Sequence, residues 1–447
     1  MLTDDLATNL VPYMPHVLEM QKNGTTFARY FVADSLCCPS RSSIFTGRFP
    51  HDTGVFTNGG KDGGYATFVA RGHEHATFAT ALSPAGYQTA FLGKYLNGYL
   101  PVKDGVPPGW SFWAGAGHAY SNFTYNLNQD GKIVHYGDKP EDYLTDVVAE
   151  LAARFIAARH EPFIIEVATF APHAPYTPAP RDAEAFPGLR APRTAAYDAA
   201  PDAAAPKWLA GMPPLSEADQ KMIDNHFRKR AQAVQAVDAM IGKLQAAVAA
   251  SGEGQNTYFI FSSDNGYHMG EHRLMPGKQT PYETDIRVPL IVTGPGVPAG
   301  RVVEEIVQNS DLCPTFAELG GATAPPAVDG KSLVPLLHGE RPEWRTMALI
   351  EHHGPHTDAS DPDAPVIRGG NPTSYESIRT SSSLYVEYAD GEKEYHDLAA
   401  DPDELRNTFA SLAPAEQEKL HAALTAIAGC HDAASCWAAQ RPAPAAR

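Results

Sequence analysis

Short, mainly apolar runs that lead directly into charged or polar side chains recur along this chain and constrain its fold. Runs of this kind are typical of strands buried in a parallel sheet. In open α/β sheets, ligands bind beyond the carboxyl ends of the strands. We therefore expect distant segments to bring polar side chains to one edge of such a sheet. The runs and the residues after them are 89–92 with Gly93–Lys94, 163–167 with Pro172–His173, and 258–261 with Asp264–Asn265.

The segments between and after these runs fit the helices, strands and loops of an α/β fold. Ser216, followed by acidic residues, predicts a helix start, and apolar residues recur at helical spacing from Val234 to Val248. Residues 288–292 are a further strand candidate. The Ala- and Pro-rich stretch from about 190 to 214 predicts a long surface loop, and residues 384–391 predict a hairpin arm with its turn.

Length, composition and charge restrict the classes of protein. The 447 residues suffice for one large α/β domain with a smaller appendage, and a hydrophobic content of 43% supports a sizeable core. No apolar run is long enough to predict a transmembrane helix. The net charge of -17 argues against a nucleic-acid partner or an anionic membrane surface. An anionic substrate would therefore need a local cluster of cations.

The cysteines indicate the redox compartment of the protein, and the two chain ends indicate targeting and disorder. The chain has five cysteines, and Cys430 and Cys436 lie close together in sequence. They form either a local disulfide, which fits an oxidising compartment, or a pair of reduced surface thiols. No signal peptide is visible, because Met1–Leu2 leads directly into Thr3-Asp4-Asp5. The Ala/Pro-rich segment from Gln440 predicts a disordered tail.

Residues 36–47, Leu-Cys-Cys-Pro-Ser-Arg-Ser-Ser-Ile-Phe-Thr-Gly, are the most distinctive segment. Alone, a Cys-Cys pair would be read as small buried hydrophobes or half of a disulfide. With Pro-Ser-Arg and Thr-Gly in register, the segment resembles the signature of the type I, formylglycine-dependent sulfatases. The resemblance makes Cys37, two residues before the proline, the modified position, and it leaves Cys38 as the free position of the motif.

That family, part of the alkaline phosphatase superfamily, implies both a cofactor and a fold. Its cysteine is oxidised by a formylglycine-generating enzyme to an aldehyde whose hydrate is the nucleophile. The expected α/β fold is alkaline-phosphatase-like: a large, mixed, mostly parallel sheet between helices, with a smaller C-terminal α+β subdomain carrying a short antiparallel sheet. We place the catalytic domain at 1–340, the C-terminal subdomain at 341–430 and a tail at 431–447. In the family a buried strand precedes Thr-Asp-Asp, and here that first strand looks truncated.

Asp4, Asp5, Asp264 and Asn265 resemble the two halves of the family's metal site. A hard divalent cation prefers carboxylate and amide oxygens, and the set contains no cysteine that would favour zinc. The expected ion is calcium, with magnesium as the alternative. Taken alone, the Asp-Asp pair would fit a helix cap, and Asp-Asn-Gly would fit a turn. The Cys37 signature decides in favour of the metal.

Four cationic side chains are expected to surround the nucleophile. Arg41 lies one helical turn after Cys37 if the segment is helical, and the resemblance gives it the role of anchoring the nucleophile. By resemblance, Lys94 contacts the sulfate as a compact cation, and Lys278 bridges the sulfate and the leaving-group oxygen. His173, in a Pro-His-x-Pro loop, would bind a sulfate oxygen or protonate the leaving alcohol, because imidazole titrates near neutrality.

One departure from the family pattern follows Lys94. Members often continue Gly-Lys-Trp-His, and that histidine helps to deprotonate the second hydroxyl of the diol, whereas this chain continues Tyr95-Leu96-Asn97. Proteins resembling glucosamine-6-sulfatases share the Lys-Tyr-Leu-Asn form, which favours a subfamily variation. We keep His268 as a candidate replacement base and interpret His272 as structural.

These features predict hydrolysis of a sulfate monoester, on a sulfated sugar or an aryl sulfate, by attack on sulfur. The first alternative is a phosphonate monoester or phosphodiester hydrolase of the same superfamily, because the two kinds of ester group share a tetrahedral shape. The second is a non-catalytic binder of sulfated glycans, should Cys37 stay unmodified. The resemblance implies a secreted, periplasmic or lysosomal-type location.

Overall fold

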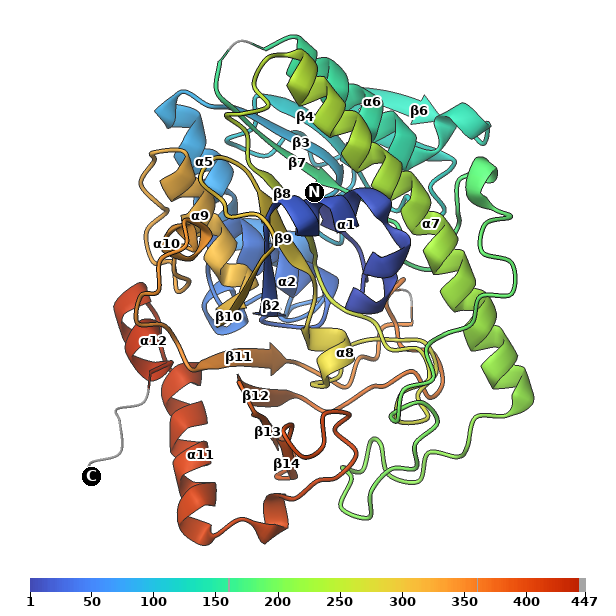
Figure 1. Cartoon of the computed structure of the whole chain (residues 1–447), viewed down its shortest axis with the longest axis vertical. Helices are drawn as coiled ribbons and strands as arrows, with labels where there is room; N and C mark the ends of the chain where they lie inside the picture. The colour runs from blue at the N-terminus through green and yellow to red at the C-terminus, as the bar shows by residue number, and fades with distance from the viewer. Residues whose placement is uncertain (160, 360, 442–447) are drawn as a thin grey trace.

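The computed structural model describes residues 1–159, 161–359 and 361–441, and a ten-stranded mixed sheet lies at its centre (Figure 1). Eight strands run in one direction, and only β9 and β5 run against them, which confirms the mostly parallel sheet. In spatial order the strands are β10 (Arg301–Gln308), β2 (Thr25–Phe31), β9 (Leu290–Thr293), β8 (Phe259–Ser263), β1 (Leu2–Thr3), β7 (Phe163–Ala168), β3 (Gln88–Lys94), β4 (Phe112–Ala116), β5 (Tyr125–Gln129) and β6 (Lys132–Tyr136).

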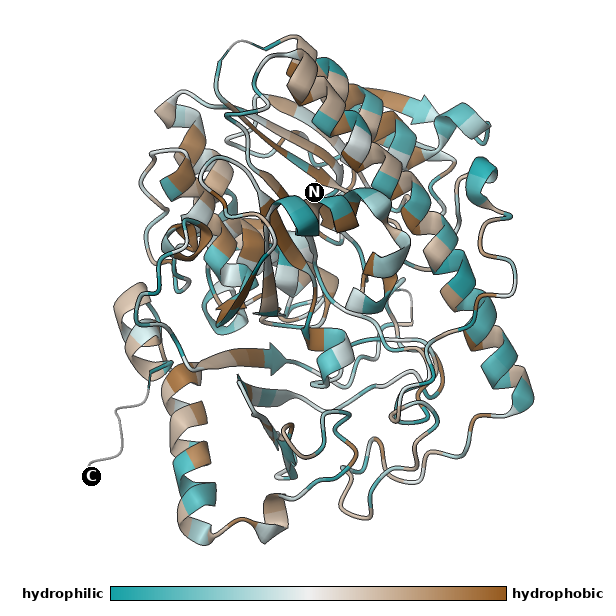
Figure 2. Cartoon of the chain, in the orientation of Figure 1, coloured by the Kyte–Doolittle hydropathy of each residue, from teal (hydrophilic) through white to brown (hydrophobic). Residues whose placement is uncertain are grey.

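Helices cover both faces of this sheet, because successive strand residues point to opposite sides. In β3, Phe91 packs into one core, whereas Ala90 and Leu92 pack into the other. Figure 2 shows the apolar residues concentrated in the central strands and on the inner sides of the helices. One face carries α1 (Pro15–Asn23), α6 (Leu144–Ala157) and α7 (Glu217–Ala250), and the other carries α2 (Cys37–Thr46), α5 (Phe78–Leu82) and α9 (Leu312–Leu319).

Short helices complete the connections. None of the helices in the described part of the chain combines the length and the apolar character needed to cross a bilayer. The short α-helices are α3 (Pro50–Thr53), α4 (Gly64–Ala70), α8 (Glu283–Ile286) and α10 (Val334–Leu337). The 3-10 helices are η1 (Thr8–Tyr13), η2 (His73–His75), η3 (Ser83–Ala85), η4 (Pro140–Asp142), η5 (Pro180–Asp182), η6 (Asn309–Asp311) and η7 (Phe409–Ser411).

The elements expected from the sequence are present. The runs 89–92, 163–167, 258–261 and 288–292 fall in β3, β7, β8 and β9. Ser216 caps α7 through the Asp219 backbone N–H, and the Asp219 carboxylate accepts the Ser216 N–H in return. This reciprocal pair satisfies two backbone groups that a helix start leaves without partners.

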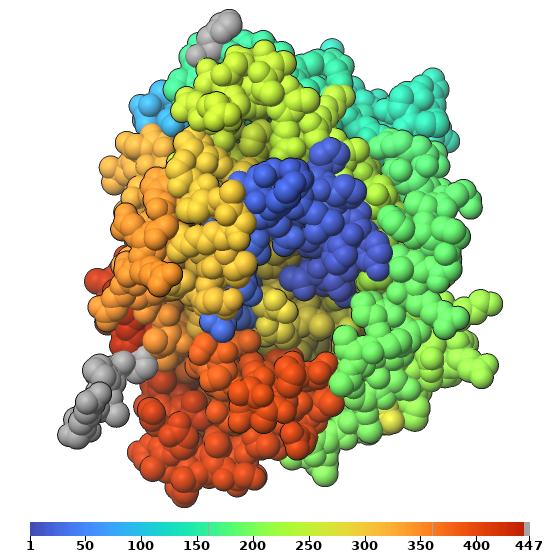
Figure 3. Space-filling view, viewed as in Figure 1, coloured from blue at the N-terminus to red at the C-terminus, as the bar shows by residue number. Residues whose placement is uncertain are grey.

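A second, four-stranded antiparallel sheet forms the C-terminal unit, which packs as a block below the large sheet (Figures 1 and 3). It lies within the range predicted for the C-terminal subdomain, and its last two strands form the predicted hairpin. The boundary at residue 340 stays a prediction. The elements are β11 (Met347–His352), β12 (Tyr375–Thr380), β13 (Ser383–Tyr388), β14 (Lys393–Asp397), α11 (Pro414–Ala428) and α12 (Ala433–Ala439).

Residues 431–441 are more ordered than expected. Cys430 and Cys436 form a disulfide, and α12 follows within the predicted tail. The prediction that disorder begins at Gln440 is wrong, because Gln440 is fully buried and its carbonyl accepts the Thr346 N–H at 3.0 Å. Residues 442–447 of the predicted tail lie outside the described residues.

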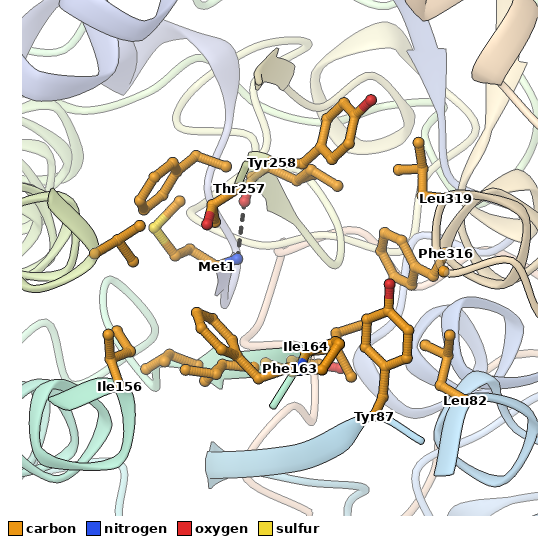
Figure 4. Close-up of a pocket in the computed structure, with 18 of the residues that line it drawn as sticks. Met1, Leu82, Tyr87, Ile156, Phe163, Ile164, Thr257, Tyr258, Phe316 and Leu319 are labelled. Atoms are coloured by element: carbon orange, nitrogen blue, oxygen red, sulfur yellow. Dashed lines mark hydrogen bonds between the residues drawn. The ribbon is translucent and has the colours of Figure 1, made fainter. Parts of the chain in front are cut away.

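The first strand is short, as expected. β1 has two residues and lies between β8 and β7, which have five and six residues. A cavity of about 520 Å³ adjoins Met1 at the amino ends of β7 and β8, where Phe163, Ile164 and Tyr258 line it (Figure 4). This cavity therefore lies at the opposite end of the strands from their carboxyl termini.

Gly93 shows how closely β3 and β7 approach beside Lys94. Gly93 has a φ of 104°, and a Cβ there would lie 1.9 Å from the Ala168 carbonyl oxygen. Gly131 has a similar φ of 87° but open space around it. We expect Gly93→Ala to lower the free energy of unfolding by about 1 to 3 kcal/mol more than Gly131→Ala, because only the first adds a clash to the backbone strain. Urea unfolding of both variants measures the difference, and equal losses would contradict this close approach.

Candidate active site

The carboxyl ends of four strands bring most of the expected site residues together. Asp4 and Asp5 follow β1, Asp264 and Asn265 follow β8, Lys94 ends β3, and the loop after β7 carries His173. Cys37 is the first residue of α2. All these side chains, with Arg41 and Lys278, are at most 4% exposed. The convergence at one edge of the sheet is the one expected from the apolar runs.

Cys37 lies at the centre of this group. Its Sγ is 3.2 Å from Asp4 Oδ1, 2.9 Å from Lys278 Nζ and 3.4 Å from Lys94 Nζ. Burial, reinforced by Asp264, raises the pKa of the Cys37 thiol well above its usual value. Because the thiolate is the reactive form of cysteine, an unmodified Cys37 is not prepared to act as a nucleophile here.

Arg41 joins three strand ends, on the same side of α2 as Cys37. Its Nε donates to Asp264 Oδ2 at 2.8 Å, and its Nη1 donates to the Lys94 carbonyl at 2.6 Å. Nη2 lies 3.9 Å from Asp4 Oδ1. The side chain is completely buried, so its charge depends on these carboxylates for compensation. Arg41 therefore fixes the acidic group and the lysine backbone relative to the first turn of α2.

The four oxygen-bearing residues form one buried group that fits a metal ion. Asp264 Oδ1 accepts the Asp5 N–H at 3.1 Å, and Asp5 Oδ1 accepts from Asn265 Nδ2 at 2.7 Å. Asn265 Oδ1 is buried and has no hydrogen-bond partner among the described residues. An orphaned carbonyl oxygen beside three buried carboxylates is the donor set that a hard divalent cation prefers. Ligand atoms of Asp4, Asp5, Cys37 and His173 also lie within 4.8 Å of one another.

Two lysines compensate these carboxylates. Lys94 Nζ lies 2.6 Å from Asp4 Oδ2, and Lys278 Nζ lies 2.7 Å from Asp5 Oδ1. Burial acts to lower the pKa of both lysines, but the neighbouring carboxylates outweigh it and hold the pKa of each well above its usual value. Both therefore remain cationic beside Cys37.

Asp363 is a member of the group that the sequence did not reveal. Its Oδ1 lies 2.5 Å from Lys278 Nζ, 2.6 Å from His173 Nε2 and 3.9 Å from Cys37 Sγ. Its Oδ2 accepts from Asn58 Nδ2 at 2.7 Å and from Asn97 Nδ2 at 3.1 Å. Burial acts to raise the pKa of Asp363, but Lys278 and His173 outweigh it and hold that pKa well below its usual value. The Asp363 carboxylate therefore places a negative charge next to Cys37, at a point where five segments meet. We call this point the anion position.

His173 carries a proton on each ring nitrogen in this arrangement. Nδ1 faces the Ala174 carbonyl at 2.7 Å, and Nε2 faces the Asp363 carboxylate at 2.6 Å. Both partners are acceptors, so both ring nitrogens must donate. Burial acts to lower the pKa of His173, but Asp5 and Asp363 outweigh it and raise the pKa above its usual value. The imidazolium therefore directs its Nε2 proton at the Asp363 carboxylate.

His268 and His272 have other surroundings. His268 Nδ1 lies 2.9 Å from Asp285 Oδ2, and its Nε2 lies 3.1 Å from the Gly369 carbonyl. The described hydrogen bonds and ion pairs include none between His268 and Cys37, so the geometry gives the replacement-base hypothesis no support. His272 is buried and stacks on Tyr282, which fits the structural role expected for it.

Asn58 and Asp363 could not be predicted from apolar runs or family motifs, which identified the other site residues. Asn58 lies in an Asn-Gly-Gly turn, and Asp363 lies in a segment rich in aspartate and proline, so neither follows an apolar run. Asn97 was visible only as a departure from the family pattern. The structure places its amide beside the other donors of the anion position.

The fold and the site define a hydrolase with an alkaline-phosphatase-like architecture. A sulfatase family model matches residues 5–322, and a model described as N-sulphoglucosamine sulphohydrolase, C-terminal, matches residues 270–428. Because the first match covers well over half of the chain, the chain belongs to the sulfatase family. Members of this family generally use a metal ion and formylglycine, and the buried Asp/Cys/His cluster fits the metal site.

Curated relatives and solved structures agree with this membership. The human N-acetylglucosamine-6-sulfatase is 35% identical over 465 residues, which cover 96% of this chain and 84% of that protein. An extracellular sulfatase SULF-1 homolog of Drosophila melanogaster is 36% identical over 367 residues, which cover 79% of this chain and 32% of that protein.

Two solved structures share the fold at lower sequence identity. A protein solved in complex with its substrate, D-glucosamine-2-N,6-O-disulfate, has a TM-score of 0.76 and 24% identity, covering 95% of this chain and 96% of that one. The phosphonate monoester hydrolase of Agrobacterium radiobacter has a TM-score of 0.73 and 22% identity, covering 96% of this chain and 95% of that one. At these identities the likeness shows the fold alone.

Proposed function

We propose that this chain hydrolyses the 6-O-sulfate ester of N-acetylglucosamine units. The observation that carries the proposal is the convergence of Lys94, His173 and Lys278 around Cys37: both lysines contact its Sγ, and Lys278 and His173 contact the carboxylate beside it. The sugar is proposed from the relatives named N-acetylglucosamine-6-sulfatase, which match nearly the whole chain. The Lys-Tyr-Leu-Asn sequence, whose Asn97 amide faces the same carboxylate, supports that branch.

The chemistry at residue 37 depends on a modification. Oxidised to formylglycine and hydrated, Cys37 would supply an oxygen nucleophile with a second hydroxyl on the same carbon. Asp4, Asp5, Asp264 and Asn265 would hold one divalent cation, proposed to be calcium, that neutralises charge on the sulfate group. Formylglycine-generating enzyme is the partner that this proposal requires during maturation.

The remaining side chains bind the ester and move protons. Lys94 and Lys278 place positive charge where sulfate oxygens would lie, and Arg41 holds Asp264 in place behind them. His173 directs its Nε2 proton into the same position and would give it to the leaving oxygen. Preorganised cations in a site closed to water stabilise charge that develops in the transition state.

A phosphonate monoester hydrolase is the alternative to be tested, because one such enzyme shares the fold. The position next to Cys37 holds a single carboxylate, which favours an anion with one negative charge. Sulfate and phosphonate monoesters both meet this condition, whereas a phosphate monoester carries a second charge near neutral pH. Turnover should therefore be compared on 4-nitrophenyl sulfate, phosphate and phenylphosphonate and on N-acetylglucosamine 6-sulfate. A kcat/KM higher for the phosphonate than for both sulfates would overturn the proposal, and no turnover with residue 37 modified would favour the non-catalytic binder.

The leaving-group role predicts a substrate-dependent defect. His173→Ala should lower kcat on N-acetylglucosamine 6-sulfate by about 100-fold or more, because a sugar alcohol needs a proton as it leaves. The loss on 4-nitrophenyl sulfate should be at least tenfold smaller, since nitrophenolate leaves without protonation. Lys278→Ala should show the same trend. The measurement is kcat for each variant on both esters.

His268→Asn is the matched control, because His268 is also a buried histidine close to the site. Its ring contacts Asp285 and Gly369, so its replacement should change both substrates by the same factor. If His173→Ala and His268→Asn gave the same ratio of losses, the leaving-group role of His173 would be withdrawn.

We infer an oxidising location for the protein. The Cys430–Cys436 disulfide supports it, and one relative is named an extracellular sulfatase. Alkylation of the protein taken directly from its host, under denaturing conditions, should leave both cysteines unmodified. Alkylation of both would contradict this location.

A further inference from the structure

The carboxylate of Asp363 occupies the place in which the proposed function puts the sulfate group. Its side chain has no exposed surface, and it lies against Cys37, Lys278 and His173 at 3.9, 2.5 and 2.6 Å. Two amide donors, from Asn58 and Asn97, complete its surroundings. A carboxylate bound by two cationic groups and two amides on four other segments makes the interactions expected of a bound sulfate ester.

Asp363 and a sulfate ester cannot use this position together. The two anions would compete for the same Lys278 and His173 protons, and their like charges would repel at close range in a buried site. We propose that Asp363 is an internal substitute for the sulfate group, which closes the site of the free enzyme and must leave as the ester enters. The proposal rests on the proposed function only in taking sulfate as the anion.

The segment that carries Asp363 is attached firmly on one side. Arg368 pairs with Asp219 at 3.2 Å, and its carbonyl accepts the Met275 N–H at 2.8 Å. The next carbonyl, that of Gly369, faces His268 Nε2 at 3.1 Å. These contacts hold residues 368–369 beside the loop that leads to Lys278. His268, a candidate base from the sequence, makes one of these anchoring contacts.

Between Asp363 and this anchor the segment has little packing of its own. Val366 is 56% exposed and Ile367 is 90% exposed, the highest exposure among the large apolar residues reported for the described part of the chain. The Asp363 carbonyl accepts one hydrogen bond, from Gln279 Nε2 at 3.2 Å. The Asp363 carboxylate is therefore the main contact that keeps residues 363–367 over the site. The Asp363 carboxylate and the sulfate ester each carry one negative charge. Their exchange leaves the local charge unchanged, so the displacement of residues 363–367 does not require a change of protonation.

Asp363→Asn tests the proposal with inorganic sulfate as the probe; sulfate is a dianion with one charge more than the ester, so the variant and the unaltered protein are compared with each other on this same probe. The amide keeps the shape but removes the charge, so the open form becomes more populated and the apparent affinity for sulfate rises. We expect the dissociation constant of sulfate, measured by calorimetry on the calcium-loaded protein at fixed ionic strength, to fall about tenfold or more. KM for N-acetylglucosamine 6-sulfate should fall by a similar factor. Asp62→Asn is the control for general charge, because Asp62 is a nearby exposed acid paired with His353; its effect should stay within about twofold. An unchanged or weaker sulfate affinity in Asp363→Asn would overturn the proposal.

Hydrogen exchange on the unaltered protein gives a second measurement that does not depend on the variant folding. Saturating sulfate should increase the exchange of the backbone amides of residues 363, 364, 366 and 367, because Asp363 leaves its donors; Pro365 has no amide proton to exchange. Unchanged or slower exchange would show that Asp363 is a fixed part of the site, and the proposal would fail. The two proposals are separable: tighter sulfate binding without hydrolysis of any sulfate ester would remove the proposed function and keep the internal substitute.

Discussion

Replacing Cys37 by alanine should lower kcat on every sulfate ester by about 10,000-fold or more, a loss typical of removing a catalytic nucleophile. Cys37→Ser should be almost as damaging, because a serine hydroxyl is a weak nucleophile and has no second hydroxyl on the same carbon to expel the product. The fold should change little, since Cys37 Sγ contacts the polar groups of the site rather than the apolar core. Steady-state kinetics with both ester types, together with thermal unfolding, measure both effects.

Cys38→Ser is the matched control, because Cys38 is equally buried and occupies the next position of α2. It contributes to the apolar core, and the described hydrogen bonds include none between its sulfur and the side chains of the other site residues. We expect a loss of stability and a kcat within about tenfold of the unaltered protein. If Cys38→Ser abolished turnover and Cys37→Ala did not, the register of the motif would be wrong.

Removing the metal should have the second largest effect. Asp264→Asn keeps the volume of the side chain but removes one of the three carboxylates around Asn265 Oδ1. We expect the loss of one stoichiometric divalent cation, measured by elemental analysis, and a fall in kcat of about 1,000-fold, because the charge on the sulfate is then less well neutralised. Chelation followed by calcium should restore the unaltered protein and not the variant.

Asp264 also compensates the buried Arg41, so the variant needs a stability control. Asp238→Asn provides it, because Asp238 is 5% exposed and binds His16 at 2.7 Å, away from the site. Both variants should lose stability, but only Asp264→Asn should lose the cation. Stoichiometric zinc, or full activity without any metal, would contradict the all-oxygen site.

Most of the site residues at the edge of the sheet could be predicted, because the end of a buried strand is visible in the local sequence. An apolar run must end before a polar side chain can reach the sheet edge, and this rule placed Lys94, Asp264 and Asn265 correctly relative to β3 and β8. Arg41 was expected one helical turn from Cys37, and α2 begins at Cys37 itself. Asp4 and Asp5 depended on the family pattern, because the two residues of β1 carry almost no periodicity.

The parts that were not predicted depend on contacts between segments far apart in the chain. Asp363 meets Lys278 and His173 only through tertiary packing, and its own segment has neither strand nor helix. Gln440 begins an Ala/Pro-rich segment that predicts a disordered tail, yet it is buried, and its carbonyl accepts the Thr346 N–H. His268 was a candidate base because the histidine expected after Lys94 is absent, and the sequence could not show that its ring contacts Asp285.

The central claim is that turnover depends on an aldehyde at residue 37, and mass spectrometry of the peptide carrying Cys37 tests it most directly. Preparations with different degrees of modification would be obtained with and without co-expressed formylglycine-generating enzyme. Each would be scored for the fraction of peptide in which CHO has replaced CH2SH, and for kcat on N-acetylglucosamine 6-sulfate. We predict that kcat rises in proportion to that fraction while Cys38 stays a thiol. Full turnover in a preparation whose residue 37 is entirely unmodified cysteine would contradict the account.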